Sequence, residues 1–257
     1  MENPLVIIEK EVKLKDPVLI EGLPGLGLVG KIAAEHIISE LKAKKFASLY
    51  SPDFPPQVTI KKDGTIKNMS TDFYYYDGGK QDLIIVVGDH QGMSPRSHYS
   101  IIDKILDVAE MQGVSQFITL GGYGIGRMVK EPAILGAATS KKIVHEYKKH
   151  GVEFRNVGGS IVGAAGLLLG MGMLKKFEGI CLMCETHGQV ADPKAAKKLI
   201  ELLNTVLKLN VTTNRLEEQA KEAEESIKKL QEMVGMKQKL LQPEGMVNKE
   251  SSPSYFR

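Results

Sequence analysis

The chain has 257 residues, of which 42% are hydrophobic and 25% charged, and its formal net charge is +3. This composition is typical of a globular protein, and the length allows one large domain with an appendage or two small domains. So small a net charge gives no argument for binding nucleic acid. The only cysteines, Cys181 and Cys184, cannot build a disulfide framework and fit a reducing compartment.

Membrane insertion and secretion are also disfavoured. The first residues, Met-Glu-Asn-Pro, lack the basic and apolar blocks of a signal peptide. The most apolar stretch, 160–174, is shorter than the roughly 20 residues that a bilayer span needs, so a buried helix is expected there. We therefore expect a cytoplasmic protein that does not enter a membrane.

Short apolar runs bounded by Gly, Asp or Pro alternate with helical patterns along the chain. A two-stranded excursion is expected over 59–77, with its turn at Asp63-Gly64. The alternation predicts an α/β fold with a mostly parallel sheet and helices on both faces. The predicted strands are 17–21, 45–50, 82–88, 116–120, 133–138 and 179–185, and the predicted helices are 28–41, 96–112, 140–150, 161–176 and 193–210.

The C-terminal quarter shows a different pattern. From Leu199 to Val234, apolar or small residues recur at alternating spacings of three and four, which places them on one helical seam. Beyond Pro243 the composition cannot bury enough apolar area to fold alone. We expect a domain over 1–210, a projecting helix over 211–241 and a tail over 242–257. The seam positions that would pair helices or pack on the domain are Leu216, Ala220, Ala223, Ile227, Leu230 and Val234.

A glycine-rich segment, 21–31, joins the first predicted strand to the first predicted helix. Gly25, Gly27 and Gly30 match the dinucleotide fingerprint, and free amides at a helix N-terminus attract anions. However, a phosphate-binding loop needs Ser or Thr after its lysine, where this chain has Ile32. The next predicted strand also ends without the required acid. The pattern favours glycines that allow a tight turn and close packing, with no ATP or other cofactor.

Polar residues and glycines follow several predicted strands, and the carboxyl ends of parallel strands meet at one edge of a sheet. They could form an acid–base or metal cluster, or serve as caps and turns. No nucleophile elbow or pair of histidines at helical spacing accompanies them, so no metal is assigned and catalysis is disfavoured. The candidate crevice residues are Gly25, Gly27, Asp89, His90, Gly122, Glu185 and His187.

Cys181 and Cys184 form a Cys-x-x-Cys pattern within an apolar strand. A redox pair of this type needs a helix N-terminus to lower the thiol pKa. Residues three apart on a strand face opposite sides. The pattern therefore predicts two buried, small hydrophobic side chains.

Three segments, 21–30, 86–91 and 120–124, resemble the archaeal members of the proteasome assembly chaperone family, which is related to the second eukaryotic chaperone of that name. The resemblance covers about residues 5–210. It implies an α/β fold similar to that of purine nucleoside phosphorylases, without established catalysis. It also implies self-association and binding to the α ring of the 20S proteasome. Binding would use a C-terminal hydrophobic–tyrosine–any-residue motif, whose terminal carboxylate meets a basic pocket residue.

In this chain the motif positions fall on Tyr255, Phe256 and Arg257. Phe256 keeps the aromatic ring but lacks the phenolic hydroxyl, and Arg257 adds a positive charge beside the carboxylate, so each single tail should bind more weakly. Several tails on one homo-oligomer can offset this by avidity. Three functions follow. They are an ATP-independent proteasome assembly chaperone or activator-like adaptor, an oligomeric scaffold for another protein partner with its tail packed inward, and an enzyme for a nucleoside-like or phosphorylated ligand.

Overall fold

The computed structural model describes residues 3–127, 129–155 and 158–223. The chain divides into two compact units, 1–220 and 221–257. Within the described ranges, every helix is either too short or too polar to cross a bilayer. The architecture below is that of the first unit.

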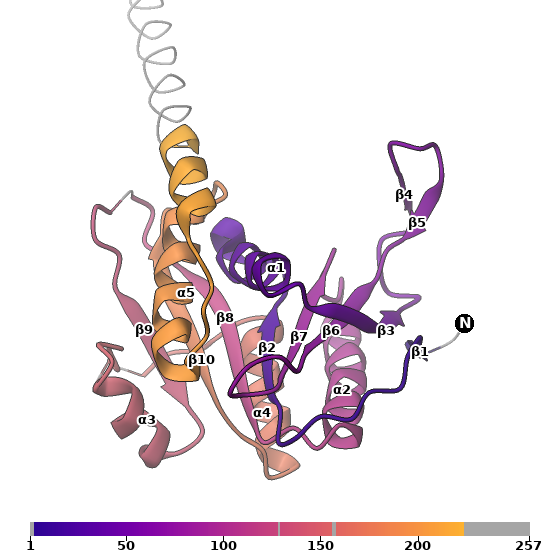
Figure 1. Cartoon of the computed structure of the whole chain (residues 1–257), viewed down its shortest axis with the longest axis horizontal. Helices are drawn as coiled ribbons and strands as arrows, with labels where there is room; N and C mark the ends of the chain where they lie inside the picture. Colours follow the sequence, from indigo (N-terminus) through magenta and orange to yellow (C-terminus); the bar gives the residue numbers. More distant parts are fainter. Residues whose placement is uncertain (1–2, 128, 156–157, 224–257) are drawn as a thin grey trace, which may run out of the picture. The chain divides into compact units, whose positions relative to one another are not determined.

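Eight strands form one sheet in the order β1-β3-β6-β7-β2-β8-β10-β9 (Figure 1). The four strands β7, β2, β8 and β10 are parallel neighbours. Since β3 and β7 are both antiparallel to β6, β3 shares their direction, and the predicted mostly parallel sheet is confirmed. The strands are β1 Leu5–Ile8, β2 Val18–Gly22, β3 Lys44–Tyr50, β6 Thr71–Tyr76, β7 Leu83–Gly88, β8 Gln116–Gly124, β9 Ile134–Ala138 and β10 Glu178–Thr186.

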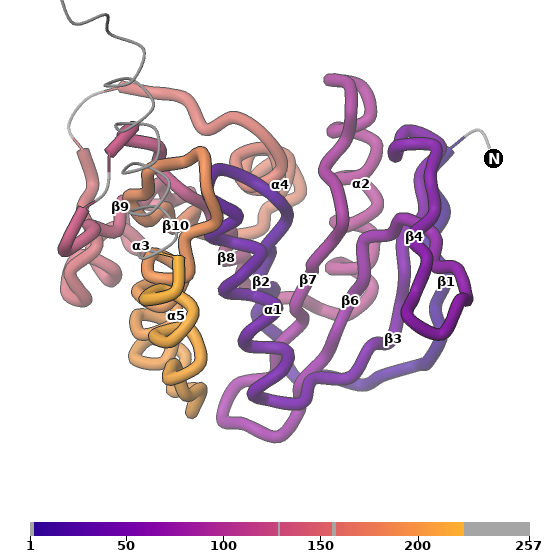
Figure 2. Tube along the Cα trace, turned by 90° about the horizontal axis from the view of Figure 1, so that it is seen from above, coloured from indigo at the N-terminus to yellow at the C-terminus, as the bar shows by residue number. Residues whose placement is uncertain are grey.

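Helices cover both faces of this sheet, as predicted (Figure 2). Alternation along the strands separates two cores: Ile85 packs on the side of α1, α3 and α5, and its neighbour Ile84 on the side of α2 and α4. As the Asp-Pro pair predicted, α5 begins at Pro193, and Asp192 accepts a capping hydrogen bond from the Ala195 N–H (2.9 Å). The helices are α1 Val29–Leu41, α2 Pro95–Met111, α3 Lys141–Lys148, α4 Ala164–Leu174 and α5 Pro193–Leu207, with a short 3-10 turn at Leu26–Leu28.

The excursion expected over 59–77 contains one strand more than predicted. The turn at Asp63-Gly64 joins β4 Val58–Ile60 to β5 Ile66–Asn68, which form a separate two-stranded sheet. The third strand, β6, instead enters the main sheet between β3 and β7. The edge strand β1 was also missed, because four residues carry too little periodicity to mark a strand.

The single seam from Leu199 to Val234 is wrong within the described residues. Helix α5 ends at Leu207, Lys208 adopts a left-handed conformation (φ +54°), and the chain is helical again only from residue 214. The Asn204 side chain holds the turn, donating to the Val211 carbonyl (2.8 Å) and accepting from the Val211 N–H (3.1 Å). The spacing persists across the break because residues on both sides of it face the same core.

Candidate functional site

The predicted crevice residues lie at or just after the carboxyl ends of β2, β7, β8 and β10, which meet at one edge of the sheet; Gly122 and Glu185 are still within β8 and β10. Asp89 forms ion pairs with Lys31 of α1 (3.9 Å) and with Lys67 of β5 (3.5 Å). Glu185 instead faces Arg155 (3.6 Å), and its strand neighbour Met183 packs against the core on the α4 side. The two carboxylates therefore have different partners on opposite faces of the sheet, and they do not come together as the acid–base alternative would require.

Nor do the histidines complete a catalytic or metal site. His90 is partly buried, and the Nδ1 of His187 is buried without a hydrogen-bond partner in the described chain. Among the described residues, no group of three or more His, Cys, Asp or Glu side chains is placed to hold a metal ion. His90 and His187 lie in the loops that follow β7 and β10, as the alternative prediction of turn residues requires.

The glycine loop is already hydrogen-bonded within the protein. The Gly27 N–H donates to the Gly188 carbonyl (3.2 Å), the Leu28 N–H to Gly25 (2.9 Å), and the Val29 N–H to Leu26. Lys31 donates to the Gly88 carbonyl (2.8 Å). A phosphate-binding loop needs free amides and a lysine that reaches over them. In this loop the amides of Gly27, Leu28 and Val29 and the Lys31 ammonium are already bonded to the protein's own carbonyls, which supports the structural interpretation of its glycines.

Close packing explains the other glycines at this edge. A Cβ on Gly30 would lie 2.2 Å from the Leu120 carbonyl oxygen, and one on Gly122 would lie 2.3 Å from the Leu26 carbonyl oxygen. Gly27 has a positive φ of +61°. Gly25 has no neighbour within 4 Å of such a Cβ. The loop thus packs its backbone directly against β8, which only glycine permits at two of these positions.

The two cysteines are buried and free. Cys184 belongs to the core on the α1 side and Cys181 to the core on the α4 side, which confirms that they face opposite ways. Burial raises the pKa of both thiols to about 12. Both remain protonated at neutral pH, and neither has the thiolate character that redox or nucleophilic chemistry requires.

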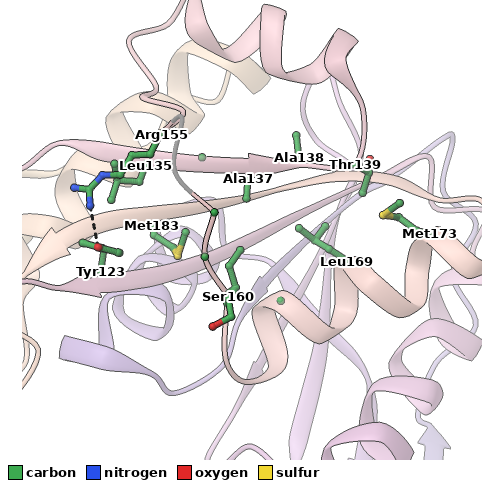
Figure 3. A pocket seen from close by; sticks show the side chains of 15 residues that line it. Tyr123, Leu135, Ala137, Ala138, Thr139, Arg155, Ser160, Leu169, Met173 and Met183 are labelled. Atoms are coloured by element: carbon green, nitrogen blue, oxygen red, sulfur yellow. Dashed lines mark hydrogen bonds between the residues drawn. The ribbon is translucent and has the colours of Figure 1, made fainter.

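A pocket that the sequence did not reveal lies beside the sheet edge, between β9, β10 and α4 (Figure 3). Its volume is about 460 Å³, and its walls are mostly apolar, with Leu135, Leu169 and Met183 among them. Concave apolar pockets of roughly 300–1,000 Å³ are the usual sites for small ligands. Size and composition are therefore compatible with a ligand of moderate size.

A fixed polar group stands at one end of this pocket. Arg155 donates from Nη1 to the Tyr123 hydroxyl (2.9 Å), and its guanidinium lies 4.6 Å from the centre of the Tyr123 ring. Glu185 receives the ion pair from Arg155 and accepts a hydrogen bond from the Ala133 N–H (3.2 Å). Tyr123 lies in segment 120–124, one of the three that carry the family resemblance, but nothing in the sequence linked Arg155 to it, because the two residues are 32 positions apart.

The seam and tail residues are only partly described. Leu216 is 1% exposed and belongs to the core on the α1 side, so it packs on its own domain, while Ala220 and Ala223 are half-buried. Ile227, Leu230 and Val234 lie outside the described residues, as do Tyr255, Phe256 and Arg257. Self-association through the seam and docking through the tail stay predictions.

The mixed eight-stranded sheet, covered by helices on both faces, defines an α/β protein. The chain belongs to the PAC2 family, whose sequence model matches residues 19–231. This confirms the family resemblance. An uncharacterised protein of Methanocaldococcus jannaschii is 42% identical over 228 residues, covering 87% of this chain and 88% of the relative.

Two solved structures from Pyrococcus furiosus are similar along most of the chain. PbaB, described as an archaeal proteasome activator, is 42% identical with a TM-score of 0.85, and the match covers 90% of this chain and 100% of PbaB. PbaA, described as an archaeal homologue of proteasome-assembly chaperone, is 29% identical with a TM-score of 0.75, and the match covers 92% of this chain and 95% of PbaA.

Proposed function

We propose that this chain is a cytoplasmic, homo-oligomeric and ATP-independent adaptor of the 20S proteasome, acting as an assembly chaperone or activator. The observation that carries the proposal is the 42% identity to PbaB, a proteasome activator, over 90% of the chain. The hydrogen-bonded glycine loop supports ATP independence, since its amides at Gly27 and Leu28 are not available to a phosphate. Docking would use Tyr255, Phe256 and Arg257, inserted between adjacent α subunits.

The decisive experiment is a pull-down with purified 20S α rings. It compares the intact chain with a variant that ends at Ser254. We expect the intact chain to bind and the truncated chain to lose binding while keeping its native mass. A matched control replaces Ser251 and Ser252 by glycine and leaves the last three residues in place. Equal binding by the intact and truncated chains would exclude the tail as the docking element.

If neither form binds α rings, the proposal fails and the chain is a scaffold for another protein. In that case carboxypeptidase sensitivity becomes informative, because a tail packed inward resists digestion and a free tail does not. Proteins that co-purify with the chain from its native cell would then identify the partner.

A second candidate function, binding of a small ligand, is favoured by the pocket that ends at Arg155 and Tyr123. A thermal-shift screen with nucleosides, nucleotides and phosphosugars tests it. A ligand that stabilises the intact chain but not Arg155→Met would support it. A flat response across the panel would exclude these ligand classes.

A further inference from the structure

The hairpin β4–β5 is a projecting arm, and among the described elements no other helix or strand packs extensively against its two strands (Figure 1). All six residues of its two strands are exposed. A two-stranded hairpin alone in water is marginally stable at best, because it has no face on which to bury apolar side chains. An ordered arm of this kind calls for a surface that covers it.

The arm has one apolar face and one polar face. Ile60 and Ile66 lie directly opposite each other in the pairing, and Val58 shares their face because it is two residues from Ile60. They are 74%, 63% and 47% exposed, respectively. The other face carries Thr59 paired with Lys67. The exposed isoleucines thus form one side of a ribbon and are not scattered surface residues.

Ion pairs fix which way the arm faces. Lys67, on the polar face, contacts Asp72 of β6 and Asp89 after β7, both at 3.5 Å. Asp72 is itself buried and accepts a hydrogen bond from Ser48 (2.8 Å). These contacts tie the polar face to the body of the domain, so the apolar face of Ile60 and Ile66 is directed away from it.

A groove of about 560 Å³ lies at the base of the arm, against the edge strand β1. Leu5, Ile7 and Tyr50 line it together with Phe54 and Pro55, and none of its lining residues is charged. Leu5 and Ile7 are 49% and 46% exposed, although edge strands usually carry charges or proline that discourage pairing. The groove is therefore a second uncovered apolar surface on the same chain.

We propose that the apolar face of the arm of one copy occupies the β1 groove of a second copy. Each chain carries both halves of the contact, so two copies can exchange arms reciprocally, as in a two-fold symmetric dimer. The charges are also complementary: Lys61 and Lys62 are exposed at the tip of the arm, and Asp53, in the loop that walls the groove, is exposed. The contact deepens the proposed function, because it supplies the self-association that would present several tails together.

The test measures molar mass by light scattering after size exclusion, over a range of concentrations of the full chain. Ile60→Lys places a charge on the apolar face, and Thr59→Lys places the same charge one residue away on the polar face. We expect Ile60→Lys to weaken association about 10- to 100-fold, as the loss of one buried isoleucine implies, and Thr59→Lys to leave it unchanged. Thermal unfolding checks that both variants fold.

A complementation experiment identifies the groove as the partner of the arm. Ile7→Lys damages the groove and leaves the arm intact, while Ile60→Lys does the reverse. Each variant alone should be dissociated, and an equimolar mixture should regain dimer, because one arm-and-groove contact is intact in the mixed pair. Both native cysteines are buried, so Ile60→Cys mixed with Ile7→Cys should also form a specific cross-linked dimer.

The proposal is overturned if the intact chain is monomeric throughout, if Ile60→Lys and Thr59→Lys associate equally, or if the mixture stays dissociated. Pull-down of the same samples with α rings keeps the two proposals apart. If Ile60→Lys keeps the molar mass of the intact chain and the chain binds the rings through its tail, only the proposed arm contact is excluded. If Ile60→Lys disrupts the oligomer but the intact chain does not bind α rings, only the proposed proteasome function is excluded.

Discussion

Glu21 lies at the carboxyl end of the central strand β2 and is 1% exposed. Burial raises its pKa to about 8, while the hydrogen bond that its Oε1 accepts from the Leu23 N–H (2.8 Å) lowers it. Its other carboxyl oxygen has no hydrogen-bond partner among the described residues. The side chain is therefore a neutral acid at physiological pH, and its ionisation is coupled to unfolding.

The sign of this coupling gives the first prediction. Below pH 4.5 the group is protonated in both states; between 4.5 and about 8 only the folded chain keeps the proton, so stability falls as pH rises through this window. Glu21→Gln should remove that slope. The difference in unfolding free energy between Glu21→Gln and the wild type should grow in favour of the variant by about 2–4 kcal/mol from pH 5 to pH 9. Urea unfolding across this range measures it, with exposed Glu11→Gln as control. Parallel pH curves for wild type and Glu21→Gln would contradict the prediction.

The glycines of the same loop differ in how closely the Cβ of a substituted alanine would approach neighbouring atoms. Gly30→Ala places a Cβ 2.2 Å from the Leu120 carbonyl oxygen, so the helix must move away from β8. We expect a loss of about 1–3 kcal/mol in unfolding free energy, even after the gain in helix propensity. Gly25→Ala meets nothing within 4 Å in an extended conformation (φ −153°) and should change stability by less than about 0.5 kcal/mol. Equal effects in urea unfolding would contradict the packing explanation.

At the scale of elements, the segment after α5 belongs to the domain. The Thr212 carbonyl contacts His36 of α1 (2.7 Å), and Lys197 of α5 pairs with Glu217. Together with the buried Leu216, these contacts fix residues 208–217 against α1 and α5. A helix that only paired with another copy would have left Leu216 exposed in the single chain.

Leu216→Ala should therefore destabilise the domain itself. Truncating a buried leucine costs about 2–5 kcal/mol. The loss should be the same at every protein concentration, because the contact lies within one chain; a contact between copies would make it concentration-dependent. Chemical unfolding at two concentrations tests this, with exposed Arg215→Ala as the matched control. A loss of stability that appears only at protein concentrations where the oligomer dissociates would instead indicate that Leu216 pairs helices of two copies.

The sequence predicted the elements with strong local signals. Buried apolar runs such as Leu83–Gly88 and the capped start of α5 at Asp192-Pro193 are recognisable because burial on both faces and capping are local properties. The sequence placed the end of this helix at 210 and left no gap before the next one, because the three-and-four spacing continues across the break at Lys208 and the reversal depends on Asn204 reaching Val211. Period alone cannot separate one long helix from two that share a core.

The candidate site was predicted less well, for a related reason. Strand order decides which residues meet, and the sequence did not determine that Asp89 turns to α1 while Glu185 turns to the α4 side. The pair of Arg155 and Tyr123 joins a loop after α3 to the end of β8. Such contacts between distant segments leave no spacing pattern, whereas the close packing expected of the loop glycines is seen at Gly30.

At the scale of the whole molecule, the proposed arm contact and the proposed tail motif together predict how strongly a substitution in the tail changes the affinity for α rings. If the oligomer engages several α-subunit pockets at once, a substitution present in every tail changes the total binding free energy once for each bound tail. If each tail binds alone, the same change acts once. The difference between the two cases can be measured without knowing the number of subunits.

Phe256→Tyr supplies this measurement. Restoring a phenolic hydroxyl should gain about 0.5–1.5 kcal/mol per tail, or about 2- to 12-fold. In the self-associating chain, with two tails engaged, the gain should be the square of that factor, and in an Ile60→Lys background it should fall to the single factor. Biosensor titration on immobilised α rings measures both, and replacement of Ser251 and Ser252 by glycine, which leaves the last three residues unchanged, is the control. Equal gains in the two backgrounds would mean that the tails act singly, and the oligomer would then need another role.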